Sequence, residues 1–176
     1  MAIIIVVLVI GIIIVLYNIY HDKLNFVISK LNNIEEKLKS TLLKRKELIK
    51  DAEELIREKL KTEKNIFDGL ENLKDNGNIM ELDRKLLIYI GEFHLIKEKY
   101  TKLNKDEKFK KIAFAITETE DLLNAYKEYY NDNASKYNKI IKTFPLIIPT
   151  ILKRRKEKLF FDNKSIDDID YSDFKY

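Results

Sequence analysis

The chain opens with an unbroken apolar run, AIIIVVLVIGIIIVL, from Ala2 to Leu16. With the four residues that follow, up to Tyr20, the run makes nineteen residues. As a helix these reach about 30 Å, the thickness of a hydrocarbon core. Tyr17 and Tyr20 at its end suit the aromatic belt of a membrane interface. The sequence therefore predicts a transmembrane anchor over residues 1–20, with the lipid bilayer as its partner.

A cleavable signal peptide is the alternative for this run. Such a peptide has a positive segment in front, an apolar core of about 7–15 residues and small residues at its cleavage site. Here only Met1 precedes the run, and its exit, Tyr17-Asn18-Ile19-Tyr20, carries bulky side chains. We therefore expect the segment to be retained as an anchor.

Basic residues close to the anchor indicate its orientation. Lys23, Lys30, Lys37 and Lys39 follow the anchor, whereas no Lys or Arg precedes it. Basic residues near a transmembrane helix accumulate on the cytoplasmic side. The sequence therefore predicts a single-pass protein of the cell membrane whose soluble part is cytoplasmic.

Beyond the anchor, the chain is rich in charge and poor in turn-forming residues. Charged residues make up 35% of the 176, whereas Gly numbers four and Pro two, so an all-α fold is expected. The net charge is only +4, from 33 basic and 29 acidic residues that are interspersed. This pattern is typical of solvated helix faces and does not indicate a nucleic-acid partner. The lack of cysteine excludes disulfides and thiolate chemistry.

Apolar residues recur at steps of three, four or seven through residues 24–70, 82–100 and 109–144. Such stripes are typical of long amphipathic helices that pack in a bundle or coiled coil. The turn cluster at residues 75–78, with the sequence DNGN, is predicted to end the first of these helices. Prolines interrupt the pattern after the third, and a short fourth helix is predicted over residues 150–159.

Three long helices with short connections predict an elongated antiparallel helical bundle over residues 21–161. If the first helix leaves the membrane, the second returns and the third runs outward again. The third helix is therefore expected to end far from the bilayer. The acidic tail, residues 162–176, has few apolar residues and is not expected to fold alone.

A repeated dipeptide marks the third predicted helix. Tyr130-Asn131 and Tyr137-Asn138 stand seven residues apart, and Phe144-Pro145 follows after another seven. Seven residues are about two helical turns, so the aromatic rings are expected to stack along one face, with the asparagines on the adjoining face. One interpretation is core packing with hydrogen bonds between helices. The other is a polar ladder that fixes helix register or accepts a partner strand or helix.

This pattern, Y-N-x5-Y-N-x5-F-P, resembles the C-terminal signature of the LemA family. Residues 43–49, LKRKELI, and residues 104–109, NKDEKF, resemble two further stretches of that family. The resemblance implies a membrane-attached helical-bundle protein of bacteria, and it supplies no catalytic residues. The chain departs from the family pattern at Lys50, at Lys127, and at Arg154-Arg155, where the family has a Gly-Phe pair.

A basic cluster follows the apolar residues 146–152. Its members are Lys153, Arg154, Arg155 and Lys156. It could bind anionic lipid, where each charge adds about 1 kcal/mol, or bind the acidic tail or a protein partner, or form a plain solvated end. The expected direction of the third helix argues against contact with the membrane that holds the anchor.

No catalytic or cofactor-binding pattern is present. The only histidines, His21 and His94, lack the Glu-x-x-His spacing that a di-iron bundle site requires. Adjacent carboxylates such as Glu35-Glu36 and Glu53-Glu54 lie among lysines, as on solvated faces. With four glycines in the chain, no phosphate-binding loop motif occurs. We therefore expect no enzyme activity, no metal and no cofactor.

These observations predict a non-enzymatic helical scaffold or interaction module that is anchored in a bacterial membrane. The alternative is an accessory protein in membrane stress or signalling that acts through a partner enzyme. A protein partner is expected in both interpretations, and the long apolar stripes also permit a homo-oligomer.

Overall fold

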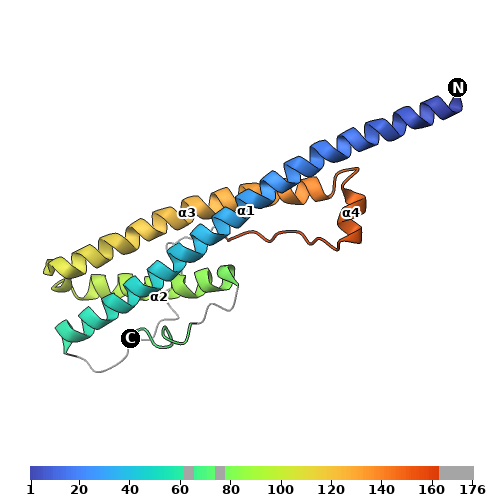
Figure 1. Cartoon of the computed structure of the whole chain (residues 1–176). Coiled ribbons are helices and arrows are strands. Elements are labelled where there is room, and N and C mark those ends of the chain that lie inside the picture. The colour runs from blue at the N-terminus through green and yellow to red at the C-terminus, as the bar shows by residue number, and fades with distance from the viewer. Residues whose placement is uncertain (62–65, 74–77, 163–176) are drawn as a thin grey trace. The chain divides into compact units, whose positions relative to one another are not determined.

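The structure is a computed structural model that describes residues 1–61, 66–73 and 78–162. Within these residues it contains helices and no strand (Figure 1). The elements are α1 (Ala2–Leu60), α2 (Ile79–Lys99), the short 3-10 helix η1 (Leu103–Lys105), α3 (Glu107–Ile141) and α4 (Ile147–Leu152). The predicted all-α fold with an apolar N-terminal helix is confirmed. The predicted tail lies almost wholly outside the described residues.

The chain forms two compact units, each described by itself. The first consists of residues 1–35 and 128–161, and the second of residues 36–127 with Asp162. Helices α1 and α3 therefore contribute to both units. The predicted boundary between anchor and bundle does not interrupt α1, because the helix is continuous through Tyr20.

In the second unit, α3 runs antiparallel to both α1 and α2. Lys59 pairs with Asp106 at 2.8 Å, and Arg45 Nε donates to Thr119 Oγ1 at 3.4 Å. The residue later in α1 therefore contacts the residue earlier in the sequence at α3. The contacts of α2 with α3 show the same order. Asp83 near its start pairs with Lys127, and the Phe93 ring lies 5.5 Å from that of Phe109. Helices α1 and α2 therefore point in the same direction, and the expected alternation of directions is wrong.

The connection between α1 and α2 explains this direction. Its described part, residues 66–73, folds back along α1. Glu53 Oε1 accepts a hydrogen bond from Ile66 N at 2.8 Å, whereas Lys46, two helical turns earlier, donates to the carbonyl of Leu73. The chain thus returns toward the start of the unit before α2 begins.

The predicted end of the first long helix is wrong for the same reason. Helix α1 ends at Leu60, and Lys61 adopts a φ of 51°. Phe67 and Leu70 continue the apolar spacing and are buried, yet they belong to a segment of turns that packs back on the core. Gly69, with a φ of 81°, provides one of these turns. The apolar residues keep the same spacing on both sides of the end of α1, so the sequence predicted one continuous helix.

Among the described residues of the second unit, three charged side chains are buried. Arg45 is 2% exposed and Asp83 is 4% exposed, and Lys127 Nζ lies 2.6 Å from Asp83 Oδ2. Burial lowers the pKa of Arg45, while the nearby carboxylates of Glu120 and Asp83 oppose that shift. The prediction that the charges lie on solvated faces is wrong at these positions. Burying ions costs free energy, and the attraction between the opposite charges of these residues offsets that cost.

We predict that Asp83→Leu lowers the free energy of unfolding by about 3–5 kcal/mol, because it leaves the Lys127 ammonium buried without its partner. The double variant Asp83→Leu/Lys127→Met removes two opposite charges, keeps the net charge of the cluster, and should restore stability to within about 1 kcal/mol of the native chain. Chemical denaturation of the full chain in detergent micelles measures both.

The matched control lies on the same helix. Glu81 and Lys85 form an exposed pair at 2.6 Å, and Glu81→Leu/Lys85→Met should leave the free energy of unfolding nearly unchanged, because exposed ion pairs contribute little. Equal losses in the Asp83 single variant and the Asp83/Lys127 double variant would show that the buried pair is not coupled.

Candidate functional site

The predicted interaction residues lie in the first unit, where the second half of α3 and the segment after it pack with residues 1–35. Tyr130, Tyr137 and Asn138 are buried, and Asn131 is half-buried. Phe144 was predicted to continue their face, but it is 53% exposed because α3 ends three residues earlier, at Ile141. Pro145 follows it and is buried.

The two asparagines of the repeat hold the segment of residues 158–161, which follows α4 and is called the C-terminal segment below. Asn138 Nδ2 donates to the Lys158 carbonyl at 2.9 Å, and its Oδ1 accepts from Lys158 N at 2.8 Å. Asn131 binds Phe161 in the same way, donating to its carbonyl at 3.0 Å and accepting from its N–H at 2.8 Å. Each side-chain amide therefore pairs with both backbone groups of one residue, as a neighbouring strand would.

The spacing of the asparagines fits this task. Seven residues on a helix cover about 10.5 Å, and three residues of extended chain cover about 10 Å. The step from Asn138 back to Asn131 therefore matches the step from Lys158 forward to Phe161. We call this arrangement the amide clamp: Asn131 and Asn138 of α3 with residues 158–161. Its occupant is a segment of the same chain, which neither interpretation of the repeat had named.

Side-chain contacts reinforce the clamp. The rings of Tyr130 and Phe161 meet edge to face with their centroids 5.1 Å apart. Lys158 Nζ pairs with Glu35 of α1 at 2.7 Å, and Lys142 pairs with Glu157 at 2.8 Å. Burial, and to a smaller extent the charge of Glu35, raises the pKa of Tyr130 to about 12. The segment is thus tied to both α1 and α3.

The short helix α4 is shorter than the predicted fourth helix and begins earlier. Pro149 lies in its first turn, where the missing N–H removes no helical hydrogen bond. The helix ends because Arg154 adopts a left-handed φ of 49°, with Arg154 N donating to the Ile151 carbonyl and Arg155 N to that of Thr150. This position favours glycine, which adopts a left-handed φ without strain.

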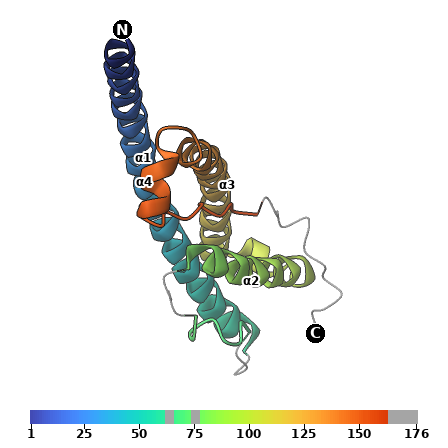
Figure 2. The same cartoon turned by 90° about the vertical axis from the view of Figure 1, so that its right-hand side faces the viewer.

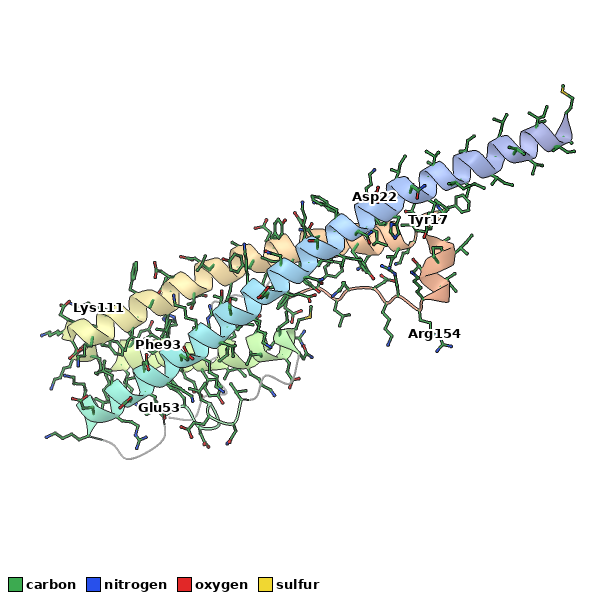
Figure 3. The ribbon with its side chains drawn as sticks, viewed as in Figure 1. Tyr17, Asp22, Glu53, Phe93, Lys111 and Arg154 are labelled. Carbon is green, nitrogen blue, oxygen red and sulfur yellow. The ribbon has the colours of Figure 1, made fainter. Side chains whose placement is uncertain are left out.

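The basic cluster emerges at this turn. The side chains of Lys153, Arg154 and Lys156 are exposed, and that of Arg155 is half-buried. Figures 1 and 2 show α4 beside the end of α3 and near the first part of α1. In Figure 3, α4 lies at the level of Tyr17. The expectation that α3 ends far from the anchor is therefore wrong, because α3 runs back along α1.

The side chains of this site hold one segment of the chain on a helix. Within residues 1–61, 66–73 and 78–162, no three His, Cys, Asp or Glu side chains are grouped so that they could hold a metal ion. What the geometry provides is an extended peptide held on a helix, and a short apolar helix with cations at its end. Lys158 was not singled out from the sequence, and Glu35 was interpreted only as a carboxylate on a solvated face, because ionic pairing across 123 residues leaves no local pattern.

The comparisons with known proteins identify a family. The model of the LemA family matches residues 32–168, which is most of the chain. No curated protein and no solved structure matches it.

We predict that Asn138→Leu releases the C-terminal segment. The substitution removes two hydrogen bonds of about 1 kcal/mol each, so the open population should rise by about 30-fold. Limited trypsin digestion should then cut faster after Lys156 and Lys158. Asn124→Leu is the matched control, because Asn124 is exposed on the same helix. Unchanged cleavage in Asn138→Leu would contradict the clamp.

A second prediction concerns the alkaline titration of Tyr130. The folded chain holds its pKa near 12, whereas an unfolded tyrosine ionises near about 10. Stability from the buried phenol is therefore complete below about pH 10 and is lost as the pH rises toward 12. The difference between phenolate absorbance curves of the native chain and Tyr130→Phe should show a midpoint near 12. A midpoint near that of a free tyrosine would contradict the burial.

Proposed function

Because this chain belongs to the LemA family, we propose that it is a membrane-anchored, non-enzymatic helical scaffold or interaction module of a bacterial envelope. One observation carries the proposal. The N-terminal part of α1 is long and apolar enough to cross a membrane, and none of that stretch is buried within the chain. Side chains such as Ile4, Leu8 and Ile10 are at least half exposed.

Lipid is the environment that such a surface needs. On the scale of membrane insertion each central Leu, Ile or Val contributes about 0.5 kcal/mol, so the run from Ala2 to Leu16 favours insertion by several kcal/mol. In water the same side chains would form an apolar patch far larger than soluble proteins tolerate.

Burial begins where the apolar run ends. Tyr17 and Tyr20 are half-buried, and Leu24 and Val27 are the first residues of α1 that are fully buried in the first unit. Lys23 lies with its ammonium 5.6 Å from the centre of the Tyr20 ring. The change from lipid-facing to protein-facing side chains therefore coincides with an aromatic and basic belt, as at a membrane interface.

We further propose that the packed part lies in the cytoplasm, since the lysines that follow the anchor favour that side. A scaffold role is supported by what the described residues offer, which is a peptide-holding helix face and exposed apolar positions. The partner would be another protein or a second copy of the chain.

The anchor and its orientation are tested together in a Phe114→Cys variant of the full chain, which is otherwise free of cysteine. Phe114 is 65% exposed on α3. The protein should stay in the membrane pellet in alkaline carbonate and dissolve in detergent. A membrane-impermeant maleimide should label it only after the cells are lysed.

Deletion of residues 2–16 is the matched comparison and should move the protein to the soluble fraction. If cells that express the unaltered protein release it into a detergent-free wash in a form that lacks the first twenty residues, the proposed anchor is wrong. Labelling in intact cells would overturn the cytoplasmic orientation alone.

A further inference from the structure

We propose that α4 and the basic residues after it form a second membrane contact, which docks on anionic lipid headgroups beside the anchor. This inference rests on the proposed anchor, because α4 must face the bilayer that α1 enters. We call the surface the α4 platform and define it by Ile147, Ile148, Ile151, Lys153, Arg154 and Lys156.

The position of α4 supports this proposal. Glu35 of α1 pairs with Lys158, and its charge raises the pKa of Tyr130 on α3. Helix α3 therefore lies beside α1 at Glu35. Ile141, where α3 ends, and Leu24 of α1 are both buried in the same unit. The chain then turns into α4 at the level of Tyr17, the residue that follows the apolar run (Figure 3). A membrane around residues 2–16 would therefore have its surface near α4.

The apolar part of the platform is uncovered. Ile148 is 55% exposed and Ile151 is 69% exposed, and the two lie three residues apart on α4. Ile147 is also exposed. Residues three or four apart share one face of a helix, so these side chains form one apolar surface at the end of the unit. Such a surface next to an anchor suits the boundary between headgroups and acyl chains.

The charge of the platform selects the kind of lipid. Lys153, Arg154 and Lys156 are exposed, and none of them forms an ion pair within the described residues. Glu157, the acidic residue next to them in the sequence, pairs with Lys142. Cations are thus in excess at this end, which complements the phosphates of an anionic leaflet.

Arg154 adds a second argument for function. Its left-handed φ of 49° is a conformation that glycine adopts without strain and that other residues rarely adopt. A charged side chain stands here although it weakens the turn, and its charge is directed to solvent beside the exposed isoleucines. This placement is expected where the cation contacts a ligand such as a headgroup phosphate.

The test uses the full chain reconstituted in vesicles, with one cysteine that carries an environment-sensitive fluorophore. The chain has no cysteine and no tryptophan, so each label reports one position. Ile151→Cys places the label on the platform. Phe114→Cys is the matched control, because Phe114 is 65% exposed and lies about 40 Å along α3 from Ile141. Ile10→Cys reports on the anchor.

In vesicles that contain phosphatidylglycerol, headgroup spin labels should quench the Ile151 label several-fold more than the Phe114 label. The difference should disappear in vesicles of phosphatidylcholine alone, and in about 1 M NaCl, where the screening length is about 3 Å. Lys153→Glu/Arg154→Glu/Lys156→Glu should abolish it as well. Lys102→Glu/Lys108→Glu/Lys111→Glu makes the same change in net charge at exposed positions and should leave it intact.

The other possible results distinguish failure of the α4 platform from failure of the anchor. If a deep spin label quenches the Ile10 label while the Ile151 label resembles the Phe114 label, the platform is wrong and the anchor stands. If the Ile10 label is not quenched, the proposed anchor fails and the platform fails with it. The Ile151 label could instead be shielded equally in vesicles with and without anionic lipid, and lose this shielding when residues 163–176 are removed. That result would assign the surface to the acidic tail and overturn the proposal.

Discussion

The antiparallel pairing of α1 with α3 determines where the other parts of each unit lie. In the second unit, Lys59 with Asp106 and Arg45 with Thr119 set its direction, and α2 packs on α3 through Asp83 and Lys127. Because α2 runs parallel to α1, the described part of the connection between them, residues 66–73, runs back along α1. Glu53 and Lys46 hold it along that course. In the first unit, the same pairing brings the end of α3 to residues 1–35.

The periodicity of the sequence was a reliable guide to the helices and a poor guide to their directions. The apolar stripes gave the extents of α2 and α3 closely, since core positions on a helix recur at three and four. They could not locate the end of α1, because Phe67 and Leu70 are core residues outside any helix that keep the helical spacing. The direction of α2 depends on how a connection packs, and no periodic pattern records that.

The buried charges leave a signal in the sequence. In α1 the apolar stripe runs through Leu38, Leu42 and Ile49, and the position between the last two is Arg45. In α3, Lys127 occupies a comparable gap between Leu123 and Tyr130. A charged residue at a stripe position indicates burial with a partner, whereas the same residue off the stripe indicates solvent. The partner itself, Asp83, cannot be identified without the tertiary contacts.

The asparagine repeat shows the same division between what is local and what is not. Its heptad spacing predicted that Asn131 and Asn138 share a face, and one of its two interpretations was a polar ladder that fixes helix register or accepts a partner strand or helix. That the strand is residues 158–161 follows only from the fold. The match between seven helical residues and three extended ones is a geometric reason for the repeat, independent of core packing by the tyrosines.

The amide clamp also accounts for the existence of α4. A helix of six residues is far below the length that is stable alone in water, so α4 depends on contacts at both of its ends. Ile141 is buried where α3 ends, and Lys158 is fixed by Asn138 and Glu35. The residues between them form a closed loop, in which the ordering of α4 requires less loss of chain entropy than in a free tail. Opening the clamp would remove this closure, and α4 would lose its defined position near Tyr17. The hydrogen bonds of Asn131 and Asn138 therefore fix the chain that follows α4, and this limits the positions that the exposed isoleucines of α4 can take.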